Sequence, residues 1–346
     1  MRPKSILNLM GGLLSNIFVS VYPFGEYDTS PLEILNTTNS EVTYNPYKRK
    51  LKPEELRDLA LSADCVIAGT EDMNPLIDSS INLRFISRVG IGLDSVPLYK
   101  CKQKGIRVSY TPDAVTMAVA ELTVGLMVTI TRHVLVTDKN LRQNQWTRLT
   151  GKRIGKSVIG IIGLGRVGIN VVKLLSNFQP KEILVNDIKN KIDIISDFQK
   201  DFKLNIKSAS KEDIFQQADI VSLHIPLTSK TRNLINSHTL KLFQKNTFLL
   251  NTSRGSIIKE GDLHDALLKK SIAGAALDVF EEEPYNGKLA KLKNVILTPH
   301  IGSCSFDCRK NMELGAAQEV LRFINGEKLQ SEVPQEEYGY QEIYHD

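Results

Sequence analysis

The sequence predicts an α/β protein with two domains, each built on a parallel sheet. Short β-branched runs alternate with longer amphipathic stretches, which is the pattern of strand–helix units. The chain has 346 residues, enough for about two domains of roughly 150 residues each. Hydrophobic residues make up 42% and charged residues 24%, which excludes a disordered or fibrous chain and leaves enough apolar side chains for two cores.

The first third of the chain is predicted to hold four strands, at 17–22, 65–68, 83–89 and 106–110. Helices are expected between them, at 52–62 and 96–104. The stretch 114–133 predicts a buried helix. Its most apolar part, 118–130, is interrupted by Glu121 and is shorter than the roughly 20 residues needed to cross a bilayer, so we expect no membrane-spanning segment.

A second and more regular series of elements follows. Strands are expected at 158–162, 182–186, 219–223, 247–251, 273–277 and 294–297, with helices at 166–177, 211–217 and 260–270. Six strands with crossover helices are enough for a complete doubly wound sheet. A last helix is predicted at 306–325, and the polar, acidic stretch 330–346 predicts a loose tail.

A glycine motif follows the first strand of this second series. The apolar run 158–162 leads into Gly163-Leu164-Gly165-Arg166-Val167-Gly168, and an amphipathic stretch follows directly. The motif G-x-G-x-x-G is weak alone, but its mechanism requires this position between a strand and a helix. Gly163 permits the tight turn, Gly165 lets a pyrophosphate approach the backbone, and Gly168 allows the helix to pack on the strand. The sequence therefore predicts a dinucleotide-binding Rossmann unit.

The choice of dinucleotide depends on Asp187, which ends the next predicted strand 19 residues beyond Gly168. A carboxylate there can accept hydrogen bonds from the adenosine ribose hydroxyls and repels a 2′-phosphate, which favours NAD over NADP. Lys189 and Lys191 lie nearby and weaken this preference. The alternative is a tight strand–helix turn followed by a solvated aspartate.

Three ionisable residues, Arg254, Glu283 and His300, lie where later strands of the same sheet end. Ligands of open α/β sheets bind beyond the carboxyl ends of the strands, so all three could face one crevice. An arginine can hold a carboxylate through two hydrogen bonds, and a histidine beside a glutamate can exchange a proton near neutral pH. Hydride transfer between a nicotinamide and an alcohol carbon needs such a proton partner. Taken singly, each residue could instead be a loop charge or a structural histidine.

With these motifs in place, the second domain resembles the D-isomer-specific 2-hydroxyacid dehydrogenase family, and most of all its D-3-phosphoglycerate dehydrogenases. The resemblance covers about residues 18–333 and rests on motifs that occur in the family's order. They are 86–94, 120–123, 163–168, 223–228, 251–255, 273–280 with 283–284, and 298–302.

The resemblance implies a role for each candidate residue. Arg254 would bind the substrate carboxylate and carbonyl, His300 would be the proton donor or acceptor, and Glu283 would be its partner. NAD would be the cofactor, and Asp187 would bind its ribose. The other implied cofactor contacts are Gly163, Gly165, Arg166, Val167, Gly168, Ile225, Thr252, Ser253, Asp278 near the nicotinamide carboxamide, and Gly302. The implied substrate contacts are Arg88, Gly90 and Arg254.

The family fold also implies domain boundaries. A smaller, flavodoxin-like substrate-binding domain would comprise 1–113 and 304–334, the NAD-binding Rossmann domain 114–303, and a tail 335–346. A homodimer is expected, through an arm at 141–153 that carries Trp146.

The residues that would contact the substrate depart from the pattern of phosphoglycerate dehydrogenases. Phosphoglycerate dehydrogenases typically have one basic residue soon after the second strand and another at the end of the next strand. Arg88 fits the second position, whereas Ala68-Gly69-Thr70-Glu71 supplies no base at the first. The first candidate is interconversion of 3-phosphoglycerate and 3-phosphohydroxypyruvate. The alternatives are a hydroxypyruvate or glyoxylate reductase, a dehydrogenase of another phosphoryl- or phosphono-substituted 2-hydroxy acid, and an NAD-sensing scaffold of the corepressor kind.

Charge and cysteine content add weaker expectations. The net charge of +5 suits a small anionic substrate and is too mild to indicate nucleic acid, and the basic clusters 48–52 and 148–156 are expected to be solvated surface. Four cysteines are few for this length, which favours reduced thiols in the cytoplasm. His300, Cys304 and Cys308 have helical spacing but lack a fourth ligand, so no metal site is expected. Residues 1–14 are expected to be a flexible lead-in.

Overall fold

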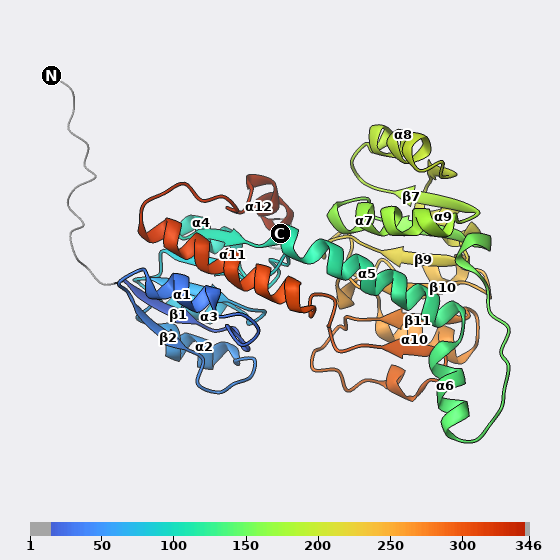
Figure 1. Cartoon of the computed structure of the whole chain (residues 1–346), viewed down its shortest axis with the longest axis horizontal. Helices are drawn as coiled ribbons and strands as arrows, with labels where there is room; N and C mark the ends of the chain where they lie inside the picture. The colour runs from blue at the N-terminus through green and yellow to red at the C-terminus, as the bar shows by residue number, and fades with distance from the viewer. Residues whose placement is uncertain (1–14, 343–346) are drawn as a thin grey trace. The chain divides into compact units, whose positions relative to one another are not determined.

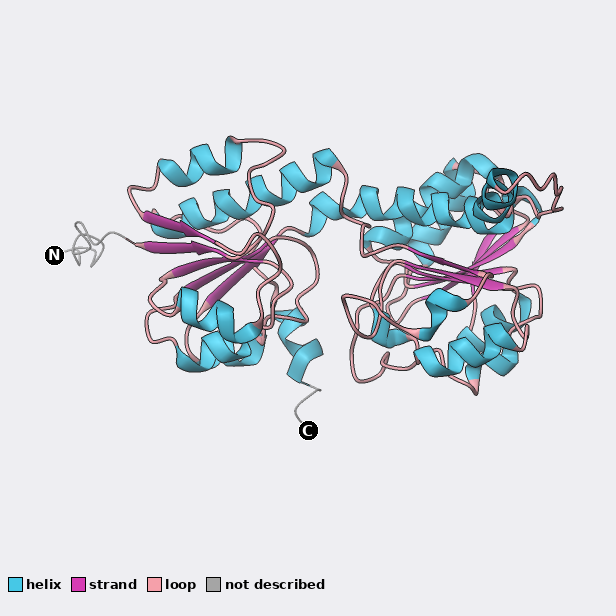
Figure 2. Cartoon of the chain, turned by 90° about the horizontal axis from the view of Figure 1, so that it is seen from below, coloured by secondary structure: helices cyan, strands magenta, loops and turns pink. Residues whose placement is uncertain are grey.

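The computed structural model describes residues 15–342, and the lead-in predicted for residues 1–14 lies outside the described residues. The chain divides into two compact units, which are called unit 1 (Met1–Val115 and Phe306–Asp346) and unit 2 (Thr116–Ser305). These limits of 115 and 306 lie near the predicted domain boundaries of 113 and 304. Each unit is a parallel sheet with helices on both faces, so the predicted α/β fold class is confirmed (Figures 1 and 2).

Unit 1 contains a five-stranded parallel sheet in the order β2-β1-β3-β4-β5. The strands are β1 (Asn16–Val19), β2 (Glu41–Tyr44), β3 (Cys65–Ala68), β4 (Phe85–Arg88) and β5 (Arg107–Tyr110). β2 is an addition to the four predicted strands. It lies at the sheet edge and its side chains are half-buried or exposed, so it lacks the apolar run that marks the other strands.

Helices cover both faces of this sheet. They are α1 (Ser30–Asn36), α2 (Pro53–Ala60), α3 (Asn74–Ser79), α4 (Leu98–Gln103), α11 (Phe306–Ile324) and α12 (Gln335–Glu342). α11 packs on β4, where the rings of Phe85 and Phe323 stack with their centroids 4.6 Å apart. α12 occupies part of the stretch predicted to be a loose tail, and that prediction is wrong for residues 335–342. The sequence of this helix has no apolar period, so the signal that marks a packed amphipathic helix is missing.

Unit 2 contains a seven-stranded parallel sheet in the order β12-β11-β10-β9-β6-β7-β8. The strands are β6 (Val158–Ile162), β7 (Glu182–Asn186), β8 (Ile206–Ser208), β9 (Ile220–Leu223), β10 (Phe248–Asn251), β11 (Gly274–Leu277) and β12 (Val295–Leu297). β8 is an addition to the six predicted strands, and only Ile206 in it is buried. The strand order reverses between β6 and β9, which is where doubly wound sheets bind their ligands.

The helices of unit 2 are α6 (Val134–Arg142), α7 (Arg166–Leu175), α8 (Ile192–Asp201), α9 (Lys211–Gln217), α10 (Glu260–Leu268) and most of α5 (Pro112–Thr131). Short 3₁₀ turns occur at η2 (Ile154–Lys156), η3 (Ser176–Phe178), η4 (Thr239–Leu242), η5 (Gly255–Ile257) and η6 (Lys288–Lys291). α8 is a further addition to the predicted elements, with Ile195 and Phe198 on its buried side. Two apolar clusters fill the core.

Among the described helices, α5 alone has the length and composition of a membrane span. Those two properties are weak support for a span, because core helices of soluble proteins share them. In α5, 44% of the most apolar window is buried, and Ala120, Val124 and Met127 belong to the core of unit 2. The absence of a membrane-spanning segment stays a prediction.

Candidate active site

The glycine motif forms the turn between β6 and α7. Gly163 has φ +98°, and a Cβ there would come within 2.4 Å of the His224 carbonyl oxygen, so the turn requires glycine. A Cβ on Gly165 would meet no atom within 4 Å, so packing inside the chain does not explain this second glycine. Gly165 is the N-cap of α7 and offers no side-chain acceptor to the first N–H groups of the helix. This arrangement fits an anion at the start of α7.

Asp187 lies at the end of β7 and holds the glycine turn. Its carboxylate accepts hydrogen bonds from the backbone N–H of Leu164 and of Lys189, each at 2.8 Å. Asp187 also lines a pocket of about 270 Å³ beyond the ends of β7 and β8. The pocket is lined by Val185, Asp187, Ile188, Lys189, Asn190, Lys191, Ile192, Ile195 and Ser208. A concave, partly apolar pocket beside a carboxylate fits an adenosine.

The turns after β9 and β10 lie at the same edge of the sheet, where Ile225 is half-buried. Thr252 is buried, and its hydroxyl hydrogen-bonds the Thr123 hydroxyl of α5 at 2.8 Å. Ser253 donates from its N–H and its hydroxyl to the side-chain oxygen of Asn251. Asn251 in turn donates to the Arg254 carbonyl at 2.8 Å, so this buried amide shapes the whole turn that carries Arg254.

The residue after Arg254 brings two turns of the site into contact. A Cβ on Gly255 would lie 1.8 Å from the Phe280 carbonyl carbon, so the Arg254 turn packs backbone to backbone against the turn that carries Glu283. The Arg254 guanidinium donates to the Ser253 carbonyl at 2.7 Å. Arg254 and Glu283 therefore lie on neighbouring turns, as expected for the ends of the adjacent strands β10 and β11.

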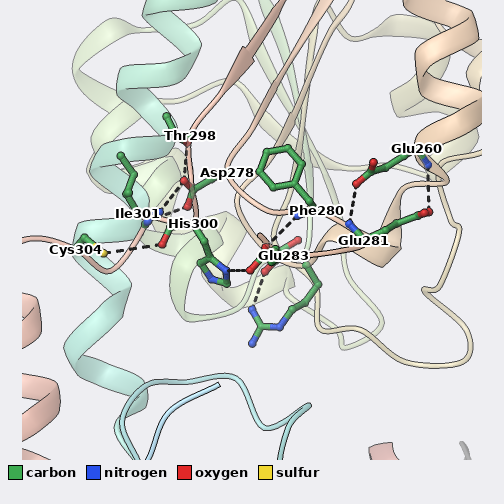
Figure 3. A network of polar contacts seen from close by, with 12 residues as sticks. Glu260, Asp278, Phe280, Glu281, Glu283, Thr298, His300, Ile301 and Cys304 are labelled. Atoms are coloured by element: carbon green, nitrogen blue, oxygen red, sulfur yellow. Dashed lines mark hydrogen bonds and ion pairs between the residues drawn. The ribbon is translucent and has the colours of Figure 1, made fainter. Parts of the chain in front are cut away.

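His300 and Glu283 form a hydrogen-bonded pair. The His300 Nδ1 atom lies 2.8 Å from a Glu283 carboxylate oxygen, and the other oxygen accepts the Phe280 N–H at 3.1 Å (Figure 3). The side chains of His300 and Glu283 are 40% and 31% exposed. The structure thus brings together two of the three residues that the strand ends predict, with the imidazole accessible to a ligand.

Asp278 holds the loop that carries His300. One carboxylate oxygen accepts the Thr298 hydroxyl at 2.5 Å and the Ile301 N–H at 2.9 Å, and the other accepts the Gly302 N–H at 2.8 Å (Figure 3). Burial raises the pKa of Asp278, and these hydrogen bonds act in the opposite direction. His300 itself has φ +54°, a left-handed conformation that such a clamp can maintain.

His224, which belongs to the motif 223–228, borders the glycine turn. Its Nε2 atom hydrogen-bonds the Ser222 hydroxyl at 2.9 Å, and its carbonyl faces Gly163. Burial lowers the pKa of His224 to about 4, so the ring is neutral at pH 7. The roles of His224, Asn251 and the Asp278 clamp depend on contacts between strand ends, for which the spacing of residues gives no signal.

Unit 1 has its own polar strand ends. Arg88 ends β4, is only 7% exposed, and its guanidinium contacts the Val89 carbonyl and lies against Gly90. Glu71 follows β3, is only 3% exposed, and accepts the Ser20 hydroxyl at 3.2 Å. Since Ala68 pairs with Arg88 in the sheet, the two charged side chains arise from neighbouring strand ends.

The chain is similar to known proteins of one family. Residues 124–302, more than half of the chain, match the model of the D-isomer specific 2-hydroxyacid dehydrogenase NAD binding domain. A glyoxylate reductase from Thermofilum pendens is 38% identical over 271 residues, which are 76% of this chain and 78% of that protein. A D-3-phosphoglycerate dehydrogenase from Methanocaldococcus jannaschii is 34% identical over 310 residues, 84% of this chain and 56% of that longer protein.

A crystal structure of a Thermus thermophilus protein has the same fold. It superposes with a TM-score of 0.81 at 28% sequence identity, over 92% of this chain and all of that one. The family model, the relatives and the fold lead to one assignment. The chain belongs to the D-isomer specific 2-hydroxyacid dehydrogenase family, and it is an NAD-dependent oxidoreductase.

Proposed function

We propose that this protein reduces a small, unphosphorylated 2-oxo acid, glyoxylate or hydroxypyruvate, to the corresponding 2-hydroxy acid. The observation that carries the proposal is the 2.8 Å hydrogen bond between the His300 imidazole and the Glu283 carboxylate. The imidazole is 40% exposed, so a substrate can reach it. NADH, when bound, supplies the hydride that the carbonyl carbon of the substrate accepts. The residues of the chain bind the substrate and deliver the proton that the carbonyl oxygen requires.

We propose that the His300–Glu283 pair delivers the proton to the substrate. Glu283 accepts a hydrogen bond from Nδ1–H of His300, so the opposite nitrogen, Nε2, carries the proton that is transferred. Arg254 binds the substrate carboxylate through its two-pronged guanidinium. Asp278 keeps the His300 loop in place, so we assign it a positioning role in addition to the implied contact with the nicotinamide carboxamide.

The cofactor contacts proposed here are those that the motifs indicate. Gly165, Arg166 and Val167 meet the pyrophosphate at the start of α7, and Asp187 binds the adenosine ribose beside its pocket. The remaining cofactor candidates, which would hold the nicotinamide end, are Ile225, Thr252, Ser253, Asp278 and Gly302. All of these residues follow strands of the unit 2 sheet at one edge.

Unit 1 supports the absence of a phosphate on the substrate. A phosphate needs accessible cations, whereas the Arg88 guanidinium is buried and folded onto its own backbone. At the neighbouring strand end the chain has an acid, Glu71, where a base is typical of phosphoglycerate dehydrogenases. We therefore propose that unit 1 contacts the substrate through the backbone at Gly90. Arg88 would act on the substrate as a buried positive charge. The 38% identity to a glyoxylate reductase supports the same choice.

The second candidate substrate is 3-phosphohydroxypyruvate, the product of 3-phosphoglycerate oxidation. It is favoured by an arginine at position 88 and by the 34% identity to a D-3-phosphoglycerate dehydrogenase. The deciding experiment measures kcat/KM with NADH for glyoxylate, hydroxypyruvate and 3-phosphohydroxypyruvate. We expect the two unphosphorylated acids to give the higher values. A higher kcat/KM for 3-phosphohydroxypyruvate would overturn the assignment in favour of the second candidate.

A homodimer is also proposed. α6 and the exposed segment after it carry apolar side chains in the solvent, namely Val134, Leu135, Leu141, Trp146 and Leu149, and Trp146 is 77% exposed. Apolar patches of this kind mark protein–protein contacts. Light scattering should give twice the mass of 38.7 kDa, and Trp146→Ala should weaken the association.

None of the four cysteines, all within the described residues, forms a disulfide, which supports a cytoplasmic location.

A further inference from the structure

The segment after α11 is anchored to unit 1 through its backbone. The buried carboxylate of Glu319 accepts the N–H groups of Gln330 and Ser331 at 3.1–3.2 Å. Glu332 then forms an antiparallel bridge with Ser109 of β5. These contacts fix where α12 starts, so its position on unit 1 is set by the sheet.

At the other end of α12, the side chain of Gln341 makes three hydrogen bonds. Its Nε2 atom donates to the carbonyls of Leu93 at 2.8 Å and Val96 at 3.1 Å. Its Oε1 atom accepts the N–H of Leu98 at 2.8 Å. Leu98 begins α4, whose N-cap residue, Pro97, provides no side-chain acceptor. Gln341 therefore caps α4 from a distance of more than 240 residues along the chain.

The turn that Gln341 holds, Leu93–Val96, lies inside the loop that leads from Gly90 to α4. Within this turn the Val96 N–H donates to the Leu93 carbonyl at 3.0 Å. The loop is also tied by the hydrogen bond from the Met73 N–H to the Ser95 carbonyl at 2.9 Å, and Gly90 at its start is tied to Thr111 by two hydrogen bonds. Leu93 and Val96 are buried in the unit 1 core, so the turn has one packed side and one side fixed by the Gln341 amide.

We propose that Gln341 is a positioning residue for substrate binding. By holding the Leu93–Val96 turn, it fixes the loop that begins at Gly90 and through which unit 1 contacts the 2-oxo acid. This inference rests on the proposed function, since it takes Gly90 as a substrate contact. It assigns a role to α12 that the composition of the polar C-terminal stretch does not indicate.

The test compares Gln341→Ala with Gln335→Ala, a control that removes an exposed glutamine from the same helix. For Gln341→Ala we expect KM for glyoxylate to rise about fivefold to tenfold, because only a fraction of molecules then holds the binding-competent loop. kcat and the Kd for NADH should stay near the wild-type values. Hydrogen exchange of the Val96 amide should accelerate about tenfold, because the turn opens more often. The control should change none of these quantities.

A second variant separates the turn from the helix cap. Gln341→Glu keeps an acceptor for the Leu98 N–H and removes both donors to the turn, so it should raise KM as Gln341→Ala does. A wild-type KM in Gln341→Ala or in Gln341→Glu, with Val96 exchange accelerated, would overturn the positioning role. Unchanged Val96 exchange in Gln341→Ala would show that Gln341 does not hold the Leu93–Val96 turn.

Failure of the proposed function would look different from these outcomes. In that case the wild-type protein would not reduce glyoxylate or hydroxypyruvate with NADH. KM would then be measured on whichever 2-oxo acid the protein does reduce. The Val96 exchange would test the Gln341 hydrogen bonds to the turn without any substrate.

Discussion

Charged side chains lie at the carboxyl ends of strands in both units, but their exposure differs. In unit 2 the His300 and Glu283 side chains are 40% and 31% exposed, whereas in unit 1 Arg88 and Glu71 are 7% and 3% exposed. In unit 2 a buried residue, Asp278, uses its carboxylate to hold backbone, which leaves the imidazole accessible. In the function proposed above, unit 2 would supply the reacting groups, and unit 1 would select the substrate through buried charge and backbone.

The strongest test of the unit 2 side is removal of the proton donor. His300→Ala should lower kcat by about 10²- to 10⁴-fold, the usual contribution of general acid–base catalysis, while NADH binding stays nearly intact. Steady-state kinetics with glyoxylate and a fluorescence titration with NADH measure the two quantities. Turnover at the wild-type rate would show that His300 is not the proton donor. The assignment of the reacting groups to unit 2 would then be wrong.

Removing the clamp below His300 should affect both activity and folding. Asp278→Ala leaves the buried Gly302 N–H and the part-buried Ile301 N–H without their acceptor, so the free energy of unfolding should fall by about 1–3 kcal/mol. kcat should also fall, because the His300 loop is no longer fixed. Thr298→Val, which removes one of the three donors, is the milder comparison. If Asp278→Ala unfolds at the wild-type denaturant concentration, the clamp has no energetic role.

The neutral His224 predicts a pH dependence of stability in unit 2. Its folded pKa of about 4 lies below its ordinary value of 6.5, so the unfolded chain binds the proton more readily. The stabilisation is present above pH 6.5 and is lost as the pH falls from 6.5 towards 4, by up to about 3 kcal/mol. Denaturant unfolding at several pH values, in the wild type and in His224→Asn, measures this loss. An equal loss in both proteins would assign it to other groups.

On the unit 1 side, the smallest expected effect is a change of substrate preference. Glu71→Gln keeps the shape of the side chain and an oxygen for the Ser20 hydroxyl but removes a negative charge. The ratio of kcat/KM for 3-phosphohydroxypyruvate to that for glyoxylate should rise about tenfold, because a repulsion against phosphate is lost. Glu332→Gln, at a half-exposed site of the same unit, is the control. An unchanged ratio in Glu71→Gln would mean that the buried charge of unit 1 does not select the substrate.

Much of the fold could be predicted from the sequence because buried parallel strands are continuous apolar runs. β6, β9 and β10 are examples, and the glycine motif after β6 could be interpreted because its strand and helix were both recognisable. β2 at the edge and β8 with its single buried residue lack that signal. α12 also lacks it, because it is held by individual contacts such as those of Gln341 and has no apolar stripe.

The site divides in the same way. The strand-end positions of Arg254, Glu283 and His300 could be predicted because all three residues follow recognisable strands, and their catalytic roles stay predictions. The acceptor role of Asp278 and the shaping of the Arg254 turn by Asn251 could not, because each depends on which backbone groups meet after folding. The burial of Arg88 is a similar case, since a strand-end arginine looks accessible in sequence and lies folded onto its own backbone in the structure.

In the proposed mechanism His300 and Glu283 act as one unit, and a double-mutant cycle measures their coupling. Glu283→Gln alone should lower kcat for glyoxylate reduction by about 10- to 100-fold, because the imidazole loses its charged partner. In a protein that already carries His300→Ala, Glu283→Gln should cause no further loss, since the glutamate acts only through the histidine. Losses that multiply in the double variant would contradict the claim and show that the two residues act independently.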